Sequence, residues 1–362
     1  MRPLEGLTVV AIEQAVAAPF ATARLADAGA RVIKIERPEG DFARGYDSVA
    51  QGQSSYFVWL NRGKESRVLD LTTPEGKDAL TVLLDGADVL VQNLKPGALG
   101  RLGFTPERLA RDWPRLITCS ISGYGESGPM ADRKAYDLLI QAESGLCSIT
   151  GGLDEPARVG ISMVDIATGA TAHAAILEAL IARGVTGKGA AISLSMFDVL
   201  ADWLTVPLLQ HEGGQTPKRV GLAHPSIAPY GVFRCRDGAE VLISVQSDRE
   251  WRKLAEIFLG QPGLGRDPRF ATNTARVANR AETDAAVAAA FAARSLPEAT
   301  AAIEAADIAF ATVNDMDGLS RHPHLRRITV DTPNGPVSYP APAPVFAGET
   351  RDYGPVPGLE TA

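Results

Sequence analysis

Hydrophobic and polar positions in the first half of the chain follow a repeating order of short apolar runs and helical segments. The runs at 7–12 and 31–36 are almost wholly apolar or β-branched, as is typical of strands covered on both faces. Between them, Pro19 lies near the start of a predicted helix and Gly29 ends it. A strand, a helix and a second strand of these lengths form a βαβ unit with parallel strands. The same order returns in predicted helices at about 74–84 and 106–111 and in predicted strands at 88–92, 116–121 and 190–195.

This order predicts an α/β fold with a Rossmann-like, doubly wound large domain. The pattern changes at a polar stretch, 212–218, which is typical of a linker. Beyond it, a hairpin with Asp237-Gly238 in its turn precedes predicted helices at about 248–258, 282–292 and 296–305. We therefore expect a large domain at 1–211, a smaller α+β domain at 218–324, and a tail rich in Pro and Gly, 325–362, that returns to the large domain.

Composition narrows the function classes. The chain has 362 residues and a formal net charge of −7, so no overall charge favours nucleic acid or an anionic membrane. Three widely spaced cysteines and five histidines without ligand spacing argue against a disulfide framework and a metal site. No signal peptide is recognised, and no apolar stretch approaches the roughly 20 residues that span a bilayer. A cytoplasmic location is expected.

The turn after the first strand argues against a dinucleotide enzyme. Residues 13–19 read Glu-Gln-Ala-Val-Ala-Ala-Pro and lack the glycines that let a backbone approach a pyrophosphate. The sequence also contains no Walker A motif and no Gly-x-Ser-x-Gly elbow. Nicotinamide chemistry and acyl transfer by a serine nucleophile are therefore disfavoured.

Asp165 is the most informative single residue. It follows a short apolar run and precedes an Ala-rich helix predicted over 166–183. A carboxylate at a helix start accepts free backbone N–H groups and interacts with the helix dipole, and both effects favour the ionised form. We therefore expect Asp165 to be a permanent anion at neutral pH. Such a carboxylate is either a nucleophile or simply a helix N-cap.

Basic residues cluster in the predicted loops of the large domain. Several follow the carboxyl ends of predicted strands, where open α/β sheets bind ligands. Each is individually explained as solvated surface charge, but their shared position favours a phosphate-bearing ligand. They are Arg37, Arg62, Lys64, Lys95, Arg101 and Lys134.

Ordered motifs over nearly the whole chain resemble the class III CoA-transferases, in the superfamily of formyl-CoA transferase and α-methylacyl-CoA racemase. The most specific are Gly29-Ala-Arg-Val-Ile-Lys-Ile-Glu-Arg-Pro38, Tyr56-Phe-Val-Trp-Leu-Asn-Arg-Gly-Lys64, Val91-Gln-Asn-Leu-Lys-Pro-Gly97, Ser122-Gly-Tyr-Gly125 and Lys134-Ala-Tyr-Asp137. The resemblance implies that Asp165 is the nucleophile. It also implies that matching loops bind coenzyme A through Arg37, Leu69, Asp70, Leu71, Thr72, Asn93, Leu94, Lys95, Arg101, Lys134 and Tyr136.

The resemblance further implies a partner and a set of substrates. The family forms an interlocked homodimer, and its substrates are an acyl-CoA and a carboxylic acid. Coenzyme A is a substrate, and no prosthetic group or metal is implied. Neither nucleic acid nor a membrane is an expected partner.

A racemase is the nearest alternative on the same fold. Racemases carry a histidine where this chain has Tyr136, and a glutamate near Ser247. Proton abstraction next to a thioester requires such bases, so the racemase interpretation is disfavoured. An acyl-CoA-binding protein without activity is the non-enzyme alternative.

The substrate prediction depends on departures from formyl-CoA transferase. The segment 224–230 lacks that enzyme's glycine-rich flap, and Val16 replaces a glutamine. We therefore expect short-chain dicarboxylic acids such as succinate, glutarate, citramalate or mesaconate, and we expect oxalate to be excluded. The expected reaction moves CoA, with succinyl-CoA as one donor, through aspartyl anhydride and aspartyl-CoA thioester intermediates. Transfer between two carboxyl groups of one diacid stays open.

Overall fold

The computed structural model describes residues 2–360, which form two compact units. Unit 1 consists of Met1–Cys147, Arg158–Gly213 and Arg326–Ala362. Unit 2 consists of Ser148–Ala157 and Gly214–Leu325. Each unit has its own hydrophobic core, so each is described by itself.

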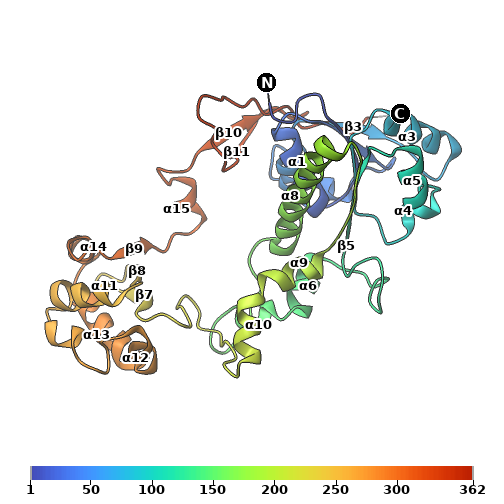
Figure 1. Ribbon diagram of the computed structural model, residues 1–362. Helices are drawn as coiled ribbons and strands as arrows, with labels where there is room; N and C mark the ends of the chain where they lie inside the picture. The colour runs from blue at the N-terminus through green and yellow to red at the C-terminus, as the bar shows by residue number, and fades with distance from the viewer. Residues whose placement is uncertain (1, 361–362) are drawn as a thin grey trace. The chain divides into compact units, whose positions relative to one another are not determined.

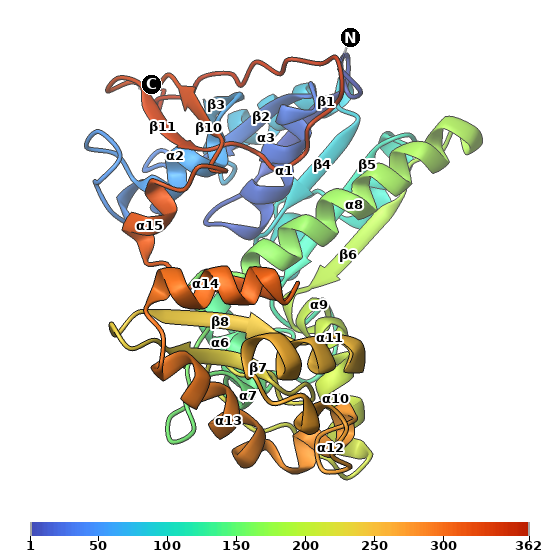
Figure 2. The same cartoon turned by 90° about the vertical axis from the view of Figure 1, so that its left-hand side faces the viewer.

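Unit 1 (Figure 1) contains a six-stranded parallel sheet, whose strand order β3-β2-β1-β4-β5-β6 can be followed in Figure 2. This is the order of a Rossmann-like doubly wound sheet, so the predicted fold class is confirmed at the level of the sheet. The order reverses between β1 and β4, which places a crevice at their carboxyl ends. The strands are β1 (Thr8–Ile12), β2 (Arg31–Glu36), β3 (Lys64–Val68), β4 (Val89–Gln92), β5 (Ile117–Ser122) and β6 (Ala191–Ser195).

Helices cover both faces of this sheet. On one face α1 and α8 pack together, and on the other lie α3, α4 and α5 (Figure 1). Alternate residues of β1 belong to the hydrophobic cores on the two faces of the sheet. Val9 and Ala11 face α1 and α8, whereas Val10 and Ile12 face α3 and α5. The helices are α1 (Ala17–Asp27), α3 (Pro74–Asp85), α4 (Ala98–Arg101), α5 (Pro106–Asp112) and α8 (Met163–Thr186).

Shorter elements complete unit 1. The antiparallel hairpin of β10 and β11 packs Val330 on Phe57 and Val58 of α2, which joins the end of the chain to its beginning. These elements are η1 (Phe42–Gly45), α2 (Ser55–Asn61), α6 (Asp137–Glu143), α9 (Met196–Trp203), α10 (Thr205–Glu212), β10 (Arg327–Val330) and β11 (Val337–Pro340); α7 (Leu146–Ile149) lies where the chain leaves the unit.

Unit 2 is a three-stranded antiparallel sheet, in the order β7-β8-β9, with helices packed around it (Figure 2). Its core includes Phe233, Trp251, Phe258 and Phe291. The predicted hairpin is present. The elements are β7 (Tyr230–Arg234), β8 (Glu240–Ser244), α11 (Asp248–Lys253), the π-helix η2 (Leu254–Phe258), η3 (Pro262–Gly265), α12 (Asn273–Ala278), α13 (Arg280–Ala292), α14 (Leu296–Ala305), β9 (Ala309–Thr312) and α15 (Met316–Ser320).

The edge strand β3 was absent from the sequence prediction because its composition is polar. It reads Lys-Glu-Ser-Arg-Val, yet Lys64 and Ser66 are buried. Lys64 donates to the buried Glu13, and Ser66 donates to Glu36. Since these partners come from other strands or their ends, the chain's local pattern does not reveal the strand.

Helix α8 is long and apolar enough to cross a membrane by length and composition, which corrects the expectation that no such stretch exists. One such helix is weak evidence, because a core helix passes the same test. Along one side, Val164, Ala172 and Ile176 belong to the core between the sheet and α1. This core accounts for the apolar residues on that side of α8, whereas only 33% of the apolar window of the helix is buried.

Close packing of α1 on α8 depends on Gly169. A Cβ atom there would lie 2.5 Å from the carbonyl oxygen of Ala17 and 2.8 Å from Cβ of Phe20. The other glycine of the helix, Gly184 in its last turn, has no heavy atom within 4 Å of such a Cβ. The same helix therefore holds one glycine required by packing and one that is not.

We expect Gly169→Ala to destabilise the protein by about 1 to 3 kcal/mol, because the added methyl group forces α1 and α8 apart. Gly184→Ala is the matched control and should stabilise by about 0.5 to 1 kcal/mol, since alanine favours a helix. Urea unfolding followed by circular dichroism measures both. Equal effects of the two substitutions would contradict this packing.

Candidate active site

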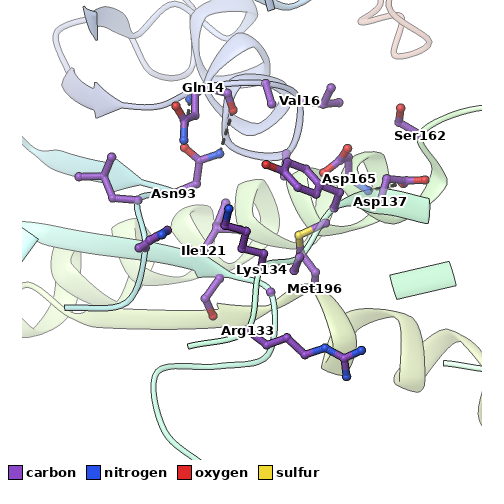
Figure 3. Close-up of a pocket in the computed structure, with 18 of the residues that line it drawn as sticks. Gln14, Val16, Asn93, Ile121, Arg133, Lys134, Asp137, Ser162, Asp165 and Met196 are labelled. Carbon is purple, nitrogen blue, oxygen red and sulfur yellow. Dashed lines mark hydrogen bonds between the residues drawn. The ribbon is translucent and has the colours of Figure 1, made fainter. Parts of the chain in front are cut away.

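A cavity of about 780 Å³ opens at the carboxyl edge of the sheet in unit 1 (Figure 3). Its walls come from the loops after β1, β4 and β5, the first turn of α8, and η1 with α2. This is the crevice where doubly wound sheets bind ligands. Gln14, Asn93, Ile121 and Asp165 line it from four of these segments.

The structure brings seven of the twelve predicted site residues into this lining and leaves five outside. The seven are Asn93, Leu94, Lys95, Arg101, Lys134, Tyr136 and Asp165. Arg37 is exposed directly after β2, and 69–72 follow β3, so both segments lie at the same edge of the sheet but do not line the cavity. Asp70 instead accepts hydrogen bonds from the backbone and hydroxyl of Thr72, which is an ordinary local turn.

Asp165 is not the N-cap of its helix, which corrects that expectation. Helix α8 begins at Met163 after the N-cap Ser162, so Asp165 is the third helical residue. Oδ1 of Asp137 instead accepts the N–H groups of Val164 at 2.7 Å and Asp165 at 3.1 Å. The Asp165 carboxylate has no hydrogen-bond partner among residues 2–360.

The expectation that Asp165 is a permanent anion is also wrong. Burial raises the pKa of the Asp165 carboxyl to about 7, and the neighbouring Asp137 charge adds to the increase. Desolvation and like-charge repulsion therefore outweigh the helix dipole, because the N–H groups that would stabilise the charge are bound by Asp137. The carboxyl thus titrates near neutrality.

Tyrosine and serine hydroxyls face the same cavity. Tyr56 lies within 3.3 Å of the Ser162 hydroxyl, and the rings of Tyr46 and Tyr56 pack edge to face at 5.5 Å. Burial raises the pKa of Tyr46 to about 12, with added repulsion from Asp41 and Asp165. The Tyr46 hydroxyl therefore stays protonated and is a donor. Sequence reasoning missed Tyr46, whose loop shows no motif.

Buried charges lie beneath the loop after β1. Lys64 donates to Glu13 Oε1 at 2.6 Å, and Lys34 donates to Asp41 Oδ2 at 2.9 Å. The side chains of these four residues are buried, and Glu13 also accepts from the Thr22 hydroxyl at 2.6 Å. Burial alone would raise the pKa of Glu13, but Lys64 and Lys34 bring it below its ordinary value.

These charges position the backbone of the cavity loop. Lys34 donates to the carbonyl of Glu13 at 3.2 Å, and Asp41 accepts the N–H of Ala15 at 3.2 Å. Ala15 has a φ of +63°, a left-handed conformation that is unfavourable for a residue with a Cβ. Asn93 binds both the N–H and the carbonyl of Gln14, at 3.0 and 2.8 Å.

The loop ends at the start of α1, where Val16 and Ala17 line the cavity. Val16 has no side-chain cap, and within the described chain no hydrogen bond of the Val16 or Ala17 N–H group is found. By contrast, the N–H groups of Met163, Val164, Asp165 and Ile166 at the start of α8 are all bonded. Donors for a developing oxyanion are thus available at the start of α1, whereas these four N–H groups at the start of α8 are occupied.

Cations line the outer part of the cavity. Arg133 pairs with Glu143 at 3.1 Å, but Lys134 and Arg158 have no anionic partner in the part of the chain that is described. Among residues 2–360, no group of three or more His, Cys, Asp or Glu side chains is placed to bind a metal ion. The available chemistry is that of a titrating carboxylate with hydroxyl and N–H donors and nearby cations.

Comparison with known proteins gives one family. The profile of CoA-transferase family III matches residues 4–359. An acetyl-CoA:oxalate CoA-transferase of Acetobacter aceti is 42% identical over 79% of this chain and 74% of its own length. A succinyl-CoA:glutarate CoA-transferase of Mus musculus is 36% identical over 95% of this chain and 80% of its own. The chain therefore belongs to CoA-transferase family III and is an enzyme of that class.

Solved structures agree with this assignment. A CAIB/BAIF family protein from Brucella suis superposes with a TM-score of 0.83 at 35% identity, covering 99% of this chain and 96% of that protein. Rv3272 from Mycobacterium tuberculosis gives a TM-score of 0.86 at 28% identity, covering 98% and 97%. The sequence-based recognition of the family is confirmed.

We expect Lys34→Met to destabilise the protein by about 3 to 5 kcal/mol, because it leaves buried carboxylates without their partner. Arg31→Met is the matched control on the same strand: its pair with Glu65 is exposed, and its loss should cost less than about 1 kcal/mol. Chemical denaturation measures both. Similar losses would contradict the structural role of the buried charges.

We expect Asp165→Asn to stabilise the protein at about pH 8 by roughly 1 to 3 kcal/mol and to have little effect at about pH 4. The folded pKa lies above the unfolded one, so between these values the native state binds more protons and wild-type stability falls as pH rises. Thermal or urea unfolding across this range measures the effect. Asp132→Asn, at an exposed position of the same cavity, is the control. A stabilisation that does not grow with pH would contradict the buried carboxylate.

Proposed function

We propose that this CoA-transferase moves CoA from an acyl-CoA, with succinyl-CoA as one donor, to a short-chain dicarboxylic or related organic acid, and that Asp165 is its nucleophile. One observation carries the proposal. The Asp165 carboxylate lines the cavity, has no hydrogen-bond partner among residues 2–360, and has a pKa of about 7. A carboxylate without stabilising donors is a stronger nucleophile than an exposed one.

The reaction proceeds through two kinds of covalent intermediate. Asp165 attacks the donor thioester and displaces the CoA thiolate, which forms a mixed anhydride. The thiolate then attacks the aspartyl carbonyl, which gives an aspartyl-CoA thioester and releases the donor acid. The acceptor carboxylate attacks this thioester, and the thiolate finally attacks the acceptor's acyl carbon and regenerates Asp165. Each step exchanges one acyl bond for another, so no oxidant or metal is needed.

Each tetrahedral intermediate carries a negative oxygen. The Val16 and Ala17 N–H groups at the start of α1 and the protonated Tyr46 hydroxyl are the donors best placed to stabilise it. This assignment is supported by position, because Val16, Ala17 and Tyr46 all line the cavity together with Asp165. The fixed conformation of the preceding loop lowers the reorganisation required of these N–H groups.

The other predicted residues serve coenzyme A. Asn93, Leu94, Lys95, Arg101, Lys134 and Tyr136 line the cavity, so they would contact the pantetheine arm and its phosphates. Arg37 and 69–72 lie at the same sheet edge beyond the lining, where the nucleotide end would reach. These assignments come from the family resemblance and stay proposals.

The class of acid is supported by relatives and by charge. Relatives named for succinyl-CoA with glutarate, D-citramalate and mesaconate are 33–40% identical to this chain. Arg158 lines the cavity without an anionic partner in the described chain, so it would bind the second carboxylate of a diacid. A relative named for oxalate is 42% identical, so oxalate belongs among the acids to be tested despite the earlier expectation.

A homodimer and a cytoplasmic location remain part of the proposal. The α9–α10 segment exposes Trp203, Val206, Leu208 and Leu209, an apolar surface of the kind that a second copy covers. In an interlocked dimer of this family, unit 2 of one protomer would close over the cavity of the other and exclude water from the anhydride.

We expect Asp165→Asn to abolish exchange of isotopically labelled carboxylic acid into acyl-CoA, with a loss of at least about 10³-fold, because the nucleophile is removed while the shape of the side chain is kept. Wild-type protein, screened with several acyl-CoA donors against diacids and oxalate, should form new acyl-CoA products by mass spectrometry.

Two outcomes would contradict this function. Undiminished exchange by the Asp165→Asn variant would exclude the nucleophile. Deuterium uptake at the α-carbon of an acyl-CoA without a free acid acceptor would indicate racemase chemistry instead.

A further inference from the structure

Two side chains of α6 bind the start of α8. Gln141 is completely buried; its Nε2 donates to Asp137 Oδ2 at 2.6 Å, and its Oε1 accepts the N–H of Val159 at 2.9 Å. The other oxygen of Asp137 accepts the N–H groups of Val164 and Asp165. Together, Gln141 and Asp137 form what we call the α6 clamp, which fixes the backbone on both sides of Ser162.

We propose that the α6 clamp is a positioning device that withholds the N–H groups at the start of α8 from Asp165 and holds the Asp137 carboxylate beside it, so that the Asp165 carboxylate faces the cavity without a donor and next to a second negative charge. The inference rests on the proposed role of Asp165 as nucleophile. It assigns Asp137 and Gln141 a function that does not involve contact with substrate. Figure 3 shows Asp137 and Asp165 as neighbours at the wall of the cavity.

The effect follows from the usual behaviour of helix starts. A carboxylate in the first turn is normally stabilised by free N–H groups and by the helix dipole. Here the N–H groups of Val164 and Asp165 are occupied by a carboxylate from another helix, which also places a second negative charge beside Asp165. The Asp165 carboxylate is left desolvated and repelled, and a more basic carboxylate is a better nucleophile.

Other groups around Asp165 do not offset this arrangement. Burial raises the pKa of Tyr46, from the loop after η1, to about 12, so this hydroxyl brings no charge to the cavity. Tyr56 from α2 and Tyr136 before α6 line the same cavity without a hydrogen bond to Asp165 in the described chain. Lys134 and Arg158 line the same cavity, but neither forms an ion pair with Asp165. Asp137 is the one charged group of the described chain whose interaction raises the Asp165 pKa.

Gln141 determines which oxygen of Asp137 is available to accept the N–H groups of α8. Because Nε2 of Gln141 donates to Oδ2, Oδ1 is directed at the two N–H groups of α8. Its carbonyl oxygen holds Val159, which is next to the cavity residue Arg158. Both ends of the segment between Arg158 and Asp165 are thus fixed by one buried amide.

The experiment titrates Asp165 directly in the full-length protein. Aspartate carboxyl carbons are labelled with carbon-13, and the Asp165 resonance is identified by its loss in Asp165→Asn. In Asp137→Asn we expect the Asp165 midpoint to fall by roughly one pH unit or more, because the amide oxygen still accepts both N–H groups but carries no charge. The acidic limb of kcat/KM for CoA transfer should move to lower pH by a similar amount.

A second variant preserves the hydrogen-bond pattern. In Asp137→Asn the new amide nitrogen would face Nε2 of Gln141, and both groups are donors. This change is therefore combined with Gln141→Glu, so that the new amide can donate to a carboxylate oxygen. The negative charge then lies farther from Asp165. The Asp165 midpoint of the double variant should lie between those of wild type and Asp137→Asn. Asp132→Asn, which removes a carboxylate of the same cavity outside the clamp, should leave the Asp165 midpoint in place.

The possible results distinguish a failure of the α6 clamp from a failure of the proposed function. An Asp165 midpoint that stays unchanged in a folded Asp137→Asn variant would overturn the clamp, even if transfer requires Asp165. A shifted midpoint in a protein without transferase activity would support the clamp's effect on Asp165 and overturn the proposed reaction.

Discussion

The conformation of the loop after β1 depends on the buried contact of Glu13, Lys34, Asp41 and Lys64. Two positive and two negative charges are removed from water there, and each has at least one charge-assisted hydrogen bond within 2.9 Å. Lys34 and Lys64 come from two neighbouring strands, and both reach the end of β1. The loop therefore keeps a left-handed Ala15 and directs the start of α1 at the cavity.

A second constraint lies across the cavity, where the carboxylates of Asp137 and Asp165 are both next to the start of α8. Asp137 takes the N–H groups of α8, and Asp165 is left with burial and repulsion alone. The donors at this helix start thus bind one carboxylate and not its neighbour, an arrangement that suits the proposed role of Asp165 as nucleophile. In the proposed mechanism, stability and reactivity are opposed at Asp165, because the features that raise its pKa also destabilise the folded protein when it ionises.

The sequence predicts the sheet and most of the helices that cover it, because their apolar runs carry the information locally. β1, β2, β4 and β5 read as buried strands, and their parallel order follows from the helices between them. The polar strand β3 was missed, since its burial depends on Glu13 and Glu36, which are distant in the chain. The charge state of Asp165 was predicted wrongly for the same reason: Asp137 lies 28 residues earlier and takes its donors.

The proposed mechanism requires Asp165 to exchange its own oxygen atoms with the substrates, and labelling with oxygen-18 detects this exchange. The acceptor acid, labelled in its carboxylate, is turned over with unlabelled acyl-CoA, and the peptide that contains Asp165 is analysed by mass spectrometry. In the proposed sequence, the oxygen that bridges the second anhydride comes from the acceptor and remains on Asp165. We expect label in this peptide only when acyl-CoA is present; product formation without label at Asp165 would contradict the proposed mechanism.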